Sequence, residues 1–203
     1  MQLIKIFLRL YIDLSDMKYL LRSLFLFILL VPAVLFSQQG SENLLGEDEN
    51  LLKWSATRKL TWDDYKANPV SESDAAASTT TLLSIEYNIT SSNFSYKIKS
   101  RFSKNRSWGL HKTNYILRHE QGHFDIAEVF ARKLHKKMGE YKFNKKTFQK
   151  DLKKIYDEVT EEKGKIQNLY DEETNHSINK KKQAEWLKMI EVKLEESAKW
   201  ATY

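Results

Sequence analysis

The chain has 203 residues, of which 41% are apolar and 30% charged, with only 6 glycines and 2 prolines. This composition favours one globular domain built from long regular elements and argues against a disordered or loop-rich chain. The absence of cysteine excludes disulfides, thiolate zinc sites, iron–sulfur clusters and a cysteine nucleophile, so a metal would need histidine or carboxylate ligands.

The first 37 residues predict a secretory signal peptide. Basic residues precede an apolar run from Leu24 to Phe36, and Ser37 supplies a small residue at the expected cleavage point. The run is shorter than the roughly 18 to 20 residues of a membrane-spanning helix, which makes a retained signal anchor the weaker alternative. Residues 1–16 look like an upstream extension, with Met17 as a possible true start. We therefore expect an exported protein, periplasmic or secreted, that meets the membrane only through this segment.

The charge of the remaining chain is mild. Four of the 33 basic residues and two of the 27 acidic residues lie before residue 38, so the rest carries a net charge of +4. Its lysine-rich stretches are interleaved with Asp and Glu, a pattern typical of solvated helix faces. No stripe of arginines with aromatic residues is present, so we expect no nucleic-acid partner.

Residues 38–50 are polar and acidic and predict a linker, which leaves residues 51–203 as the single expected domain. Near its start, Thr61 and Asp64 have the spacing of a capping box, and Pro69 closes that segment. Residues 71–78, SESDAAAS, predict a loop.

Two stretches, LLSIEYNIT at 82–90 and NFSYKIKSRF at 93–102, alternate apolar with polar residues. This period of two predicts half-buried strands, and the short polar connection between them predicts an antiparallel hairpin.

The rest of the chain has helical periodicity. A first helix is expected from about Thr113 to Met138, with Gly139 as its stop, and a second contains the apolar stripe from Phe148 to Tyr170. A third carries Trp186, Leu187, Ile190 and Leu194, after a polar connection at 171–177 whose Ser177 is a possible cap. We expect an α+β fold in which a small N-terminal hairpin or sheet packs on the first helix, followed by two long helices.

The sequence HEQGH at 119–123 is the main functional signal. On a helix, His119 and His123 lie one turn apart on one face and can both bind a zinc ion, while Glu120 can reach a water beside the metal without being a ligand. This is the arrangement of zincin metalloproteases. A charged helix also produces this pattern by accident, but Ile126, Ala127, Phe130 and Leu134 continue the histidine stripe and predict that it faces inward. Gly122, unfavourable in a helix, suggests that a strand or substrate backbone passes close.

Sequence spacing alone does not identify the third metal ligand. Val129 stands where a metzincin needs its third histidine, which excludes that subclass. His176, in the connection between the last two helices, is the preferred candidate, with the carboxylates of residues 171–173 as competitors. His111 and Tyr170 are possible auxiliary groups near a developing oxyanion, although a core role is the ordinary interpretation of Tyr170. The remaining histidine, His135, is expected to be solvated.

Asp125 and Glu128 lie roughly opposite the two histidines on the helical wheel. We expect Asp125 to be a hydrogen-bond partner or exposed, and not a metal ligand.

The chain resembles a bacterial domain-of-unknown-function family described as predicted secreted zinc-dependent proteases. The resemblance rests on KLTWDDYKANP at 59–69, on SW at 107–108 ahead of ILRHEQGHFDIAEVFARKL at 116–134, and on YDEETNHSINKKKQAEW at 170–186. It implies zinc-ligand roles for His119 and His123, a base role for Glu120, and His176 of the T-x-H segment as third ligand. Ala67 and Ser177 stand where the family commonly has glycine.

These observations predict an exported zincin-like zinc peptidase whose Glu120 serves as general base toward a peptide or protein substrate. The hairpin would offer an edge strand to an extended peptide. One alternative is a non-catalytic binding module of the cell envelope that keeps the zincin scaffold. A second is a helical interaction protein of the envelope in which HEQGH is incidental.

Overall fold

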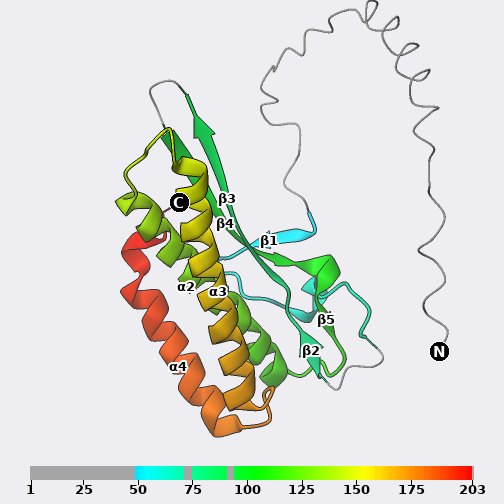
Figure 1. Cartoon of the computed structure of the whole chain (residues 1–203). Helices are drawn as coiled ribbons and strands as arrows, with labels where there is room; N and C mark the ends of the chain where they lie inside the picture. The colour runs from blue at the N-terminus through cyan, green and yellow to red at the C-terminus, as the bar shows by residue number, and fades with distance from the viewer. Residues whose placement is uncertain (1–48, 71–74, 91–93, 203) are drawn as a thin grey trace, which may run out of the picture. The chain divides into compact units, whose positions relative to one another are not determined.

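The computed structural model describes residues 49–70, 75–90 and 94–202 (Figure 1). Within these ranges the chain has an α+β fold in which three long helices accompany two small antiparallel sheets. The predicted signal peptide and nearly all of the predicted linker lie outside the described residues. Among the described helices, none combines the length and apolar character needed to cross a membrane.

The larger sheet has three strands in the order β1–β4–β3, all antiparallel. The predicted hairpin is confirmed as β3 (Thr81–Ile89) and β4 (Phe94–Ser103), in a register that places Ile85 opposite Ile98. The edge strand β1 (Leu51–Lys53) was not predicted, because three residues are too few to show a period of two.

The second sheet pairs β2 (Ala77–Ser78) with β5 (Trp108–Gly109). The prediction of a loop at 71–78 is therefore wrong at its last two residues, while residues 71–74 lie outside the described part of the chain. A strand this short, made of small residues with no polar–apolar alternation, cannot be predicted from the sequence. Its pairing depends on a partner about thirty residues further along the chain. This sheet is relevant to the site because its strands lie beside the histidines of the first long helix.

The three predicted helices are α2 (Asn114–Glu140), α3 (Phe148–Thr174) and α4 (Lys180–Glu196). The hydroxyl of Thr113 caps α2 by accepting the N–H of Ile116 at 3.2 Å. The helix runs through the expected stop at Gly139, and its last carbonyls are closed by a turn at Tyr141.

The connection between α3 and α4 is shorter than predicted. Residues 171–174 of the expected polar connection belong to α3, where the Thr174 hydroxyl donates to the carbonyl of Tyr170 at 2.6 Å. The side chain of Asn179, and not that of Ser177, caps α4 by accepting the N–H of Lys182. The extension of α3 brings Asp171 onto the same helical face as Gln167.

The core lies between the hairpin and the helices, and α2 is central to it. Tyr156 of α3 also ties the layers together, because its hydroxyl donates to the carbonyl of Leu83 in β3 at 2.7 Å. The buried members of this cluster include Leu83, Ile98, Ile126, Phe130, Leu134, Met138, Leu152, Val159, Trp186 and Ile190.

A second, smaller cluster of Leu60, Tyr65, Phe102 and Phe124 fixes the segment between β1 and β2. Asp64 accepts the N–H of Thr61 at 2.8 Å, which is the hydrogen bond expected of the capping box, although it closes only the short 3₁₀ turn Trp62–Asp64. The N–H of Leu60 donates to the side chain of Gln121 at 2.8 Å, so this segment is anchored on α2 beside the histidine motif.

Candidate metal centre

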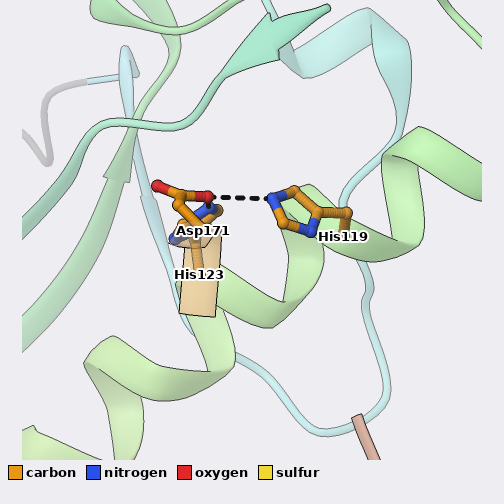
Figure 2. A group of neighbouring side chains, drawn as sticks. All are labelled: His119, His123 and Asp171. Atoms are coloured by element: carbon orange, nitrogen blue, oxygen red, sulfur yellow. Dashed lines mark hydrogen bonds and ion pairs between the residues drawn. The ribbon is translucent and has the colours of Figure 1, made fainter. Parts of the chain in front are cut away.

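Three metal-ligating side chains converge where the first half of α2 meets the end of α3 (Figure 2). The Nε2 of His119 lies 3.1 Å from Oδ1 of Asp171, and the Nε2 of His123 lies 2.9 Å from the same oxygen. The ligand atoms of all three lie within 4.8 Å of one another. Helical spacing explains the two histidines, and Asp171 comes from a helix some fifty residues away in sequence.

Gln167, one turn before Asp171 on α3, orients the ring of His123. Its Oε1 accepts the N–H of Nδ1, and its Nε2 donates to the backbone carbonyl of His123 at 2.9 Å. The second contact identifies which end of the amide is the donor, so Nδ1 of His123 carries a proton. In the neutral ring, Nε2 then presents a lone pair toward the carboxylate of Asp171.

Two lone-pair acceptors 2.9 Å apart repel each other unless a proton or a cation lies between them. A proton on Nε2 of His123 would fulfil that role in the absence of a metal. Burial alone would lower the pKa of His123, but the hydrogen bond and charge of Asp171 outweigh it and raise this pKa. Burial likewise acts to raise the pKa of Asp171, yet its hydrogen bonds to His119 and His123 hold that pKa well below its usual range.

The donor set suits a zinc ion. Two imidazoles and one carboxylate are an accepted protein ligand set for catalytic zinc, which keeps a further position for water or substrate. The Nε2 lone pair that Gln167 leaves on His123 is the form a metal needs, and a partner holding the distal N–H is the usual support of a metal-binding histidine. Nδ1 of His119 is buried without a partner among the described residues, so its tautomer is free to match a metal at Nε2.

Glu120 is only 4% exposed and lies next to the first histidine on α2. Its Oε2 is buried and has no hydrogen-bond partner among the described residues. Burying a carboxylate oxygen without a hydrogen-bond donor costs free energy. A water molecule or a ligand that donates to Oε2 would remove this cost. Glu120 lines the same cleft as the two histidines and Asp171, where a carboxylate could act as a general base if a metal were bound.

The three converging side chains and Glu120 line a cleft of about 520 Å³. One wall comes from residues 75–81, which include β2, together with Trp108 of β5. The other comes from α2 and from the stripe of α3 that carries Lys163, Gln167 and Asp171.

Tyr170 supports the site from the core side. Its side chain is fully buried, its ring stacks on that of His119 with centroids 4.5 Å apart, and its hydroxyl donates to the carbonyl of His119 at 3.2 Å. Burial raises the pKa of Tyr170. Tyr170 is thus a core residue that packs against His119 and positions it, which agrees with the core role expected from the sequence. It is not among the residues that line the cleft.

The same tyrosine explains Gly122. A Cβ atom at this position would lie 2.5 Å from the Tyr170 hydroxyl oxygen, well inside van der Waals contact. The expectation that a strand or substrate backbone passes close to Gly122 is therefore wrong, because the close neighbour is a side chain of α3. A glycine in α2 lets the Tyr170 hydroxyl reach the backbone carbonyl of His119.

His176 lies at the rim of the cleft and not within the converging group. Its side chain is 66% exposed, and its Nδ1 is 3.8 Å from Oδ1 of Asp171. It belongs to three consecutive residues, Asn175, His176 and Ser177, with φ of 47°, 50° and 74°. Such left-handed conformations are strained for side-chain-bearing residues.

The other two histidines lie apart from the cleft. The side chain of His111 is exposed, and its backbone N–H donates to the carbonyl of Ala76 at 2.9 Å, so it contributes to the path of the chain. His135 is half-buried and its Nδ1 lies 3.0 Å from the carbonyl oxygen of Trp200, which corrects the expectation that it is solvated.

On the far side of α2, Asp125 accepts hydrogen bonds from Trp54 Nε1 and Gln121 Nε2, both at 2.7 Å. The prediction that Asp125 is a hydrogen-bond partner is thus confirmed. Sequence reasoning missed Gln167 and Lys163. Gln167 lies four residues before Asp171, and Lys163 lies four residues before Gln167. This spacing was the available signal, but it has meaning only once α3 is known to extend through residue 171.

The comparisons with known proteins place the chain in one family. Residues 39–177 match the family described as bacterial protein of unknown function, DUF922, and the chain belongs to it. The match includes every residue of the cluster in Figure 2 and ends just after His176. No curated protein and no solved structure shows significant similarity to the chain.

Proposed function

We propose that this protein is a zinc-dependent peptidase with a zincin-like site. The observation that carries the proposal is the convergence of His119, His123 and Asp171 in a cleft that Glu120 also lines. The buried Oε2 of Glu120 has no hydrogen-bond partner among the described residues. The orientation of His123 by Gln167 supports it, since the ring offers a lone pair toward the common centre. His176 remains close enough to assist at the rim, and its role as the third ligand is the alternative to that of Asp171.

The residues divide the chemistry as follows. A bound zinc ion would acidify water and polarise the carbonyl of the scissile peptide bond. Oε2 of Glu120 accepts the proton of the attacking water and returns it to the nitrogen of the leaving amine. Tyr170 holds the turn that carries His119. Water is the co-substrate, and one peptide bond is exchanged for a carboxylate and an amine.

We further propose that the substrate is a peptide in extended conformation that lies along residues 75–81. This segment lines the cleft together with His119 and Glu120. Within the described residues, β2 pairs only with β5, so a peptide can add to the two-stranded sheet by β-augmentation. The edge in question belongs to this small sheet and not to the hairpin that the sequence suggested.

Export of the protein is part of the same proposal and rests on the signal-like first 37 residues. The test is the intact mass of the protein recovered from cells, which would place the mature N-terminus near Gln38. A protein that retains residue 1 or 17 and stays with the cytoplasm would contradict it.

The central experiment measures metal content by plasma mass spectrometry and hydrolysis of a degenerate peptide library on the same samples. We expect about one zinc per chain, hydrolysis by the wild type, and zinc without hydrolysis in Glu120→Gln. Iron in place of zinc would overturn the proposal, since two histidines and one carboxylate also bind ferrous iron. Zinc without any hydrolysis would favour a binding module on the same scaffold.

A further inference from the structure

Lys163 is a cation within the cleft whose role the proposed hydrolysis does not explain. It is half-buried and lines the same cleft as His123 and Glu120. Among the described residues, the hydrogen-bond partner of its Nζ is the Thr81 hydroxyl oxygen, at 3.4 Å. That contact is long for a hydrogen bond to an ammonium group. Thr81 begins β3, so the ammonium group lies where the wall formed by residues 75–81 approaches α3.

The neighbouring acidic residues of α3 are already paired. Glu162 forms an ion pair with Lys133 of α2, and Glu161 pairs with Lys165 at 2.6 Å. Across the residues that the structure describes, Lys163 forms no ion pair with a carboxylate. A half-buried lysine without a paired anion is unusual, because loss of hydration is normally offset by a paired charge. Burial lowers the pKa of Lys163 accordingly.

Lys163 also stands in register with the metal-binding residues. Lys163, Gln167 and Asp171 follow one another at intervals of four, so they form one stripe on α3 that faces the cleft. Eight residues of helix separate the first and last backbone positions by about 12 Å. An extended peptide covers that distance in about four residues.

We propose that Lys163 selects substrates with a carboxylate group close to the scissile bond, within about four residues of it. The inference rests on the proposed peptidase function. The carboxylate can come from an Asp or Glu side chain or from the C-terminus of the peptide, since both present the same anion to the ammonium group. With zinc bound, the charges of Asp171 and Glu120 would be balanced by the metal. Lys163 would then be the uncompensated charge among the described residues that line the cleft.

The experiment compares wild type with Lys163→Gln and Lys163→Glu on paired libraries of short degenerate peptides. The pairs differ only by Glu against Gln at one position, or by a free against an amidated C-terminus. We expect kcat/KM of the wild type to favour one anionic partner by about tenfold or more. The preference should vanish in Lys163→Gln and reverse in Lys163→Glu, which would favour lysine or the amidated end. The position of the preferred anion identifies its source.

Lys165→Gln is the matched control, because this lysine lies on the same helix, is exposed and pairs with Glu161. It should keep the preference of the wild type. A structural lysine that merely links α3 to Thr81 would change stability in both Lys163 variants and leave the ratio of rates between paired peptides untouched. An unchanged ratio, or a wild type without preference for either anion, overturns the inference.

A binding measurement separates this inference from the proposed function. Zinc-loaded Glu120→Gln is immobilised with and without Lys163→Glu, and the peptides retained from the same paired libraries are quantified by mass spectrometry. Enrichment of the anionic peptides that is lost with Lys163→Glu supports the inference even if no peptide is ever cut. Equal retention of anionic and neutral peptides contradicts it, whatever the hydrolysis assay shows.

Discussion

The side chain of Gln167 forms two hydrogen bonds with His123. It accepts the N–H of ring nitrogen Nδ1 and donates to the backbone carbonyl at 2.9 Å. One side chain of α3 therefore determines both the tautomer of a candidate zinc ligand and its position on α2. The consequence for metal binding can be measured directly.

Replacing Gln167 by Leu should weaken zinc binding by about 10- to 100-fold while leaving all three candidate ligands in place. The ring of His123 loses both the partner that holds its Nδ1 proton and its fixed orientation. Competition with a chelator of known affinity gives the zinc dissociation constant. Asn168→Leu, at the adjacent exposed position of α3, is the control and should retain the affinity of the wild type.

Asp171→Ala should lose zinc, whereas His176→Ala should keep most of it. Asp171 lies within 3.1 Å of both histidine rings, while the His176 side chain is 66% exposed and 3.8 Å from Asp171 at its Nδ1. Metal content after dialysis against dilute zinc compares the two variants. Zinc retained without Asp171 and lost without His176 would assign the third ligand to His176, as the family resemblance implies.

The stability of the metal-free protein should depend on pH in the opposite sense to that of the zinc form. The pKa of His123 is raised from an ordinary 6.5, so its contribution is complete below that value and is lost as pH rises through the higher folded-state pKa. The pKa of Asp171 is lowered from an ordinary 3.8, so its contribution is present above that value and is lost as pH falls through the lower folded-state pKa.

The metal-free protein should therefore gain stability from this pair between about pH 4 and 6.5 and lose part of it as pH rises through the raised folded-state pKa of His123. The zinc form should instead lose its extra stability on acidification, because protons compete with the metal for the histidines. Thermal unfolding across this pH range, with zinc and with a chelator, tests both slopes. Asp171→Asn should flatten the curve of the metal-free form. Parallel curves for the two forms would contradict this account.

Gly122→Ala should destabilise the protein by about 2 kcal/mol or more, despite the better helix propensity of alanine. Its Cβ would approach the Tyr170 hydroxyl to 2.5 Å and displace the ring that stacks on His119. Gly164→Ala is the matched control within α3, because its Cβ would meet no atom within 4 Å. That substitution should be neutral or stabilise by up to about 1 kcal/mol. Denaturant unfolding of the two variants gives both values, and equal effects would remove the argument.

Ser177→Gly should raise the free energy of unfolding by up to about 1 kcal/mol. Ser177 has φ of 74°, a conformation that glycine adopts without the steric cost of a side chain. The measurement is again denaturant unfolding, with the zinc-free protein used so that changes at the neighbouring His176 do not enter. A loss of stability would mean that the serine hydroxyl contributes more than the strain costs.

Much of the fold is predictable from local pattern. The alternation in residues 82–102 and the helical stripe through HEQGH depend on periodicity, which is a property of each segment alone. The third candidate ligand was harder to predict, because it depends on where α3 ends. A polar run such as DEETNHS has no apolar marker to show that the helix continues, so Asp171 was only one of several carboxylates beside His176. A glycine at position 122 does indicate that another group lies close to α2. That group is a side chain of α3, and sequence spacing cannot show which one it is.

The two histidines of the cluster and Asp171 lie on helices whose contributing residues are as much as 52 positions apart in the chain. The three groups meet only after α3 has been synthesised and has folded back against α2. Docking of α3 on α2 is therefore the folding step that assembles the candidate site, and any reactivity of the cluster begins with that step.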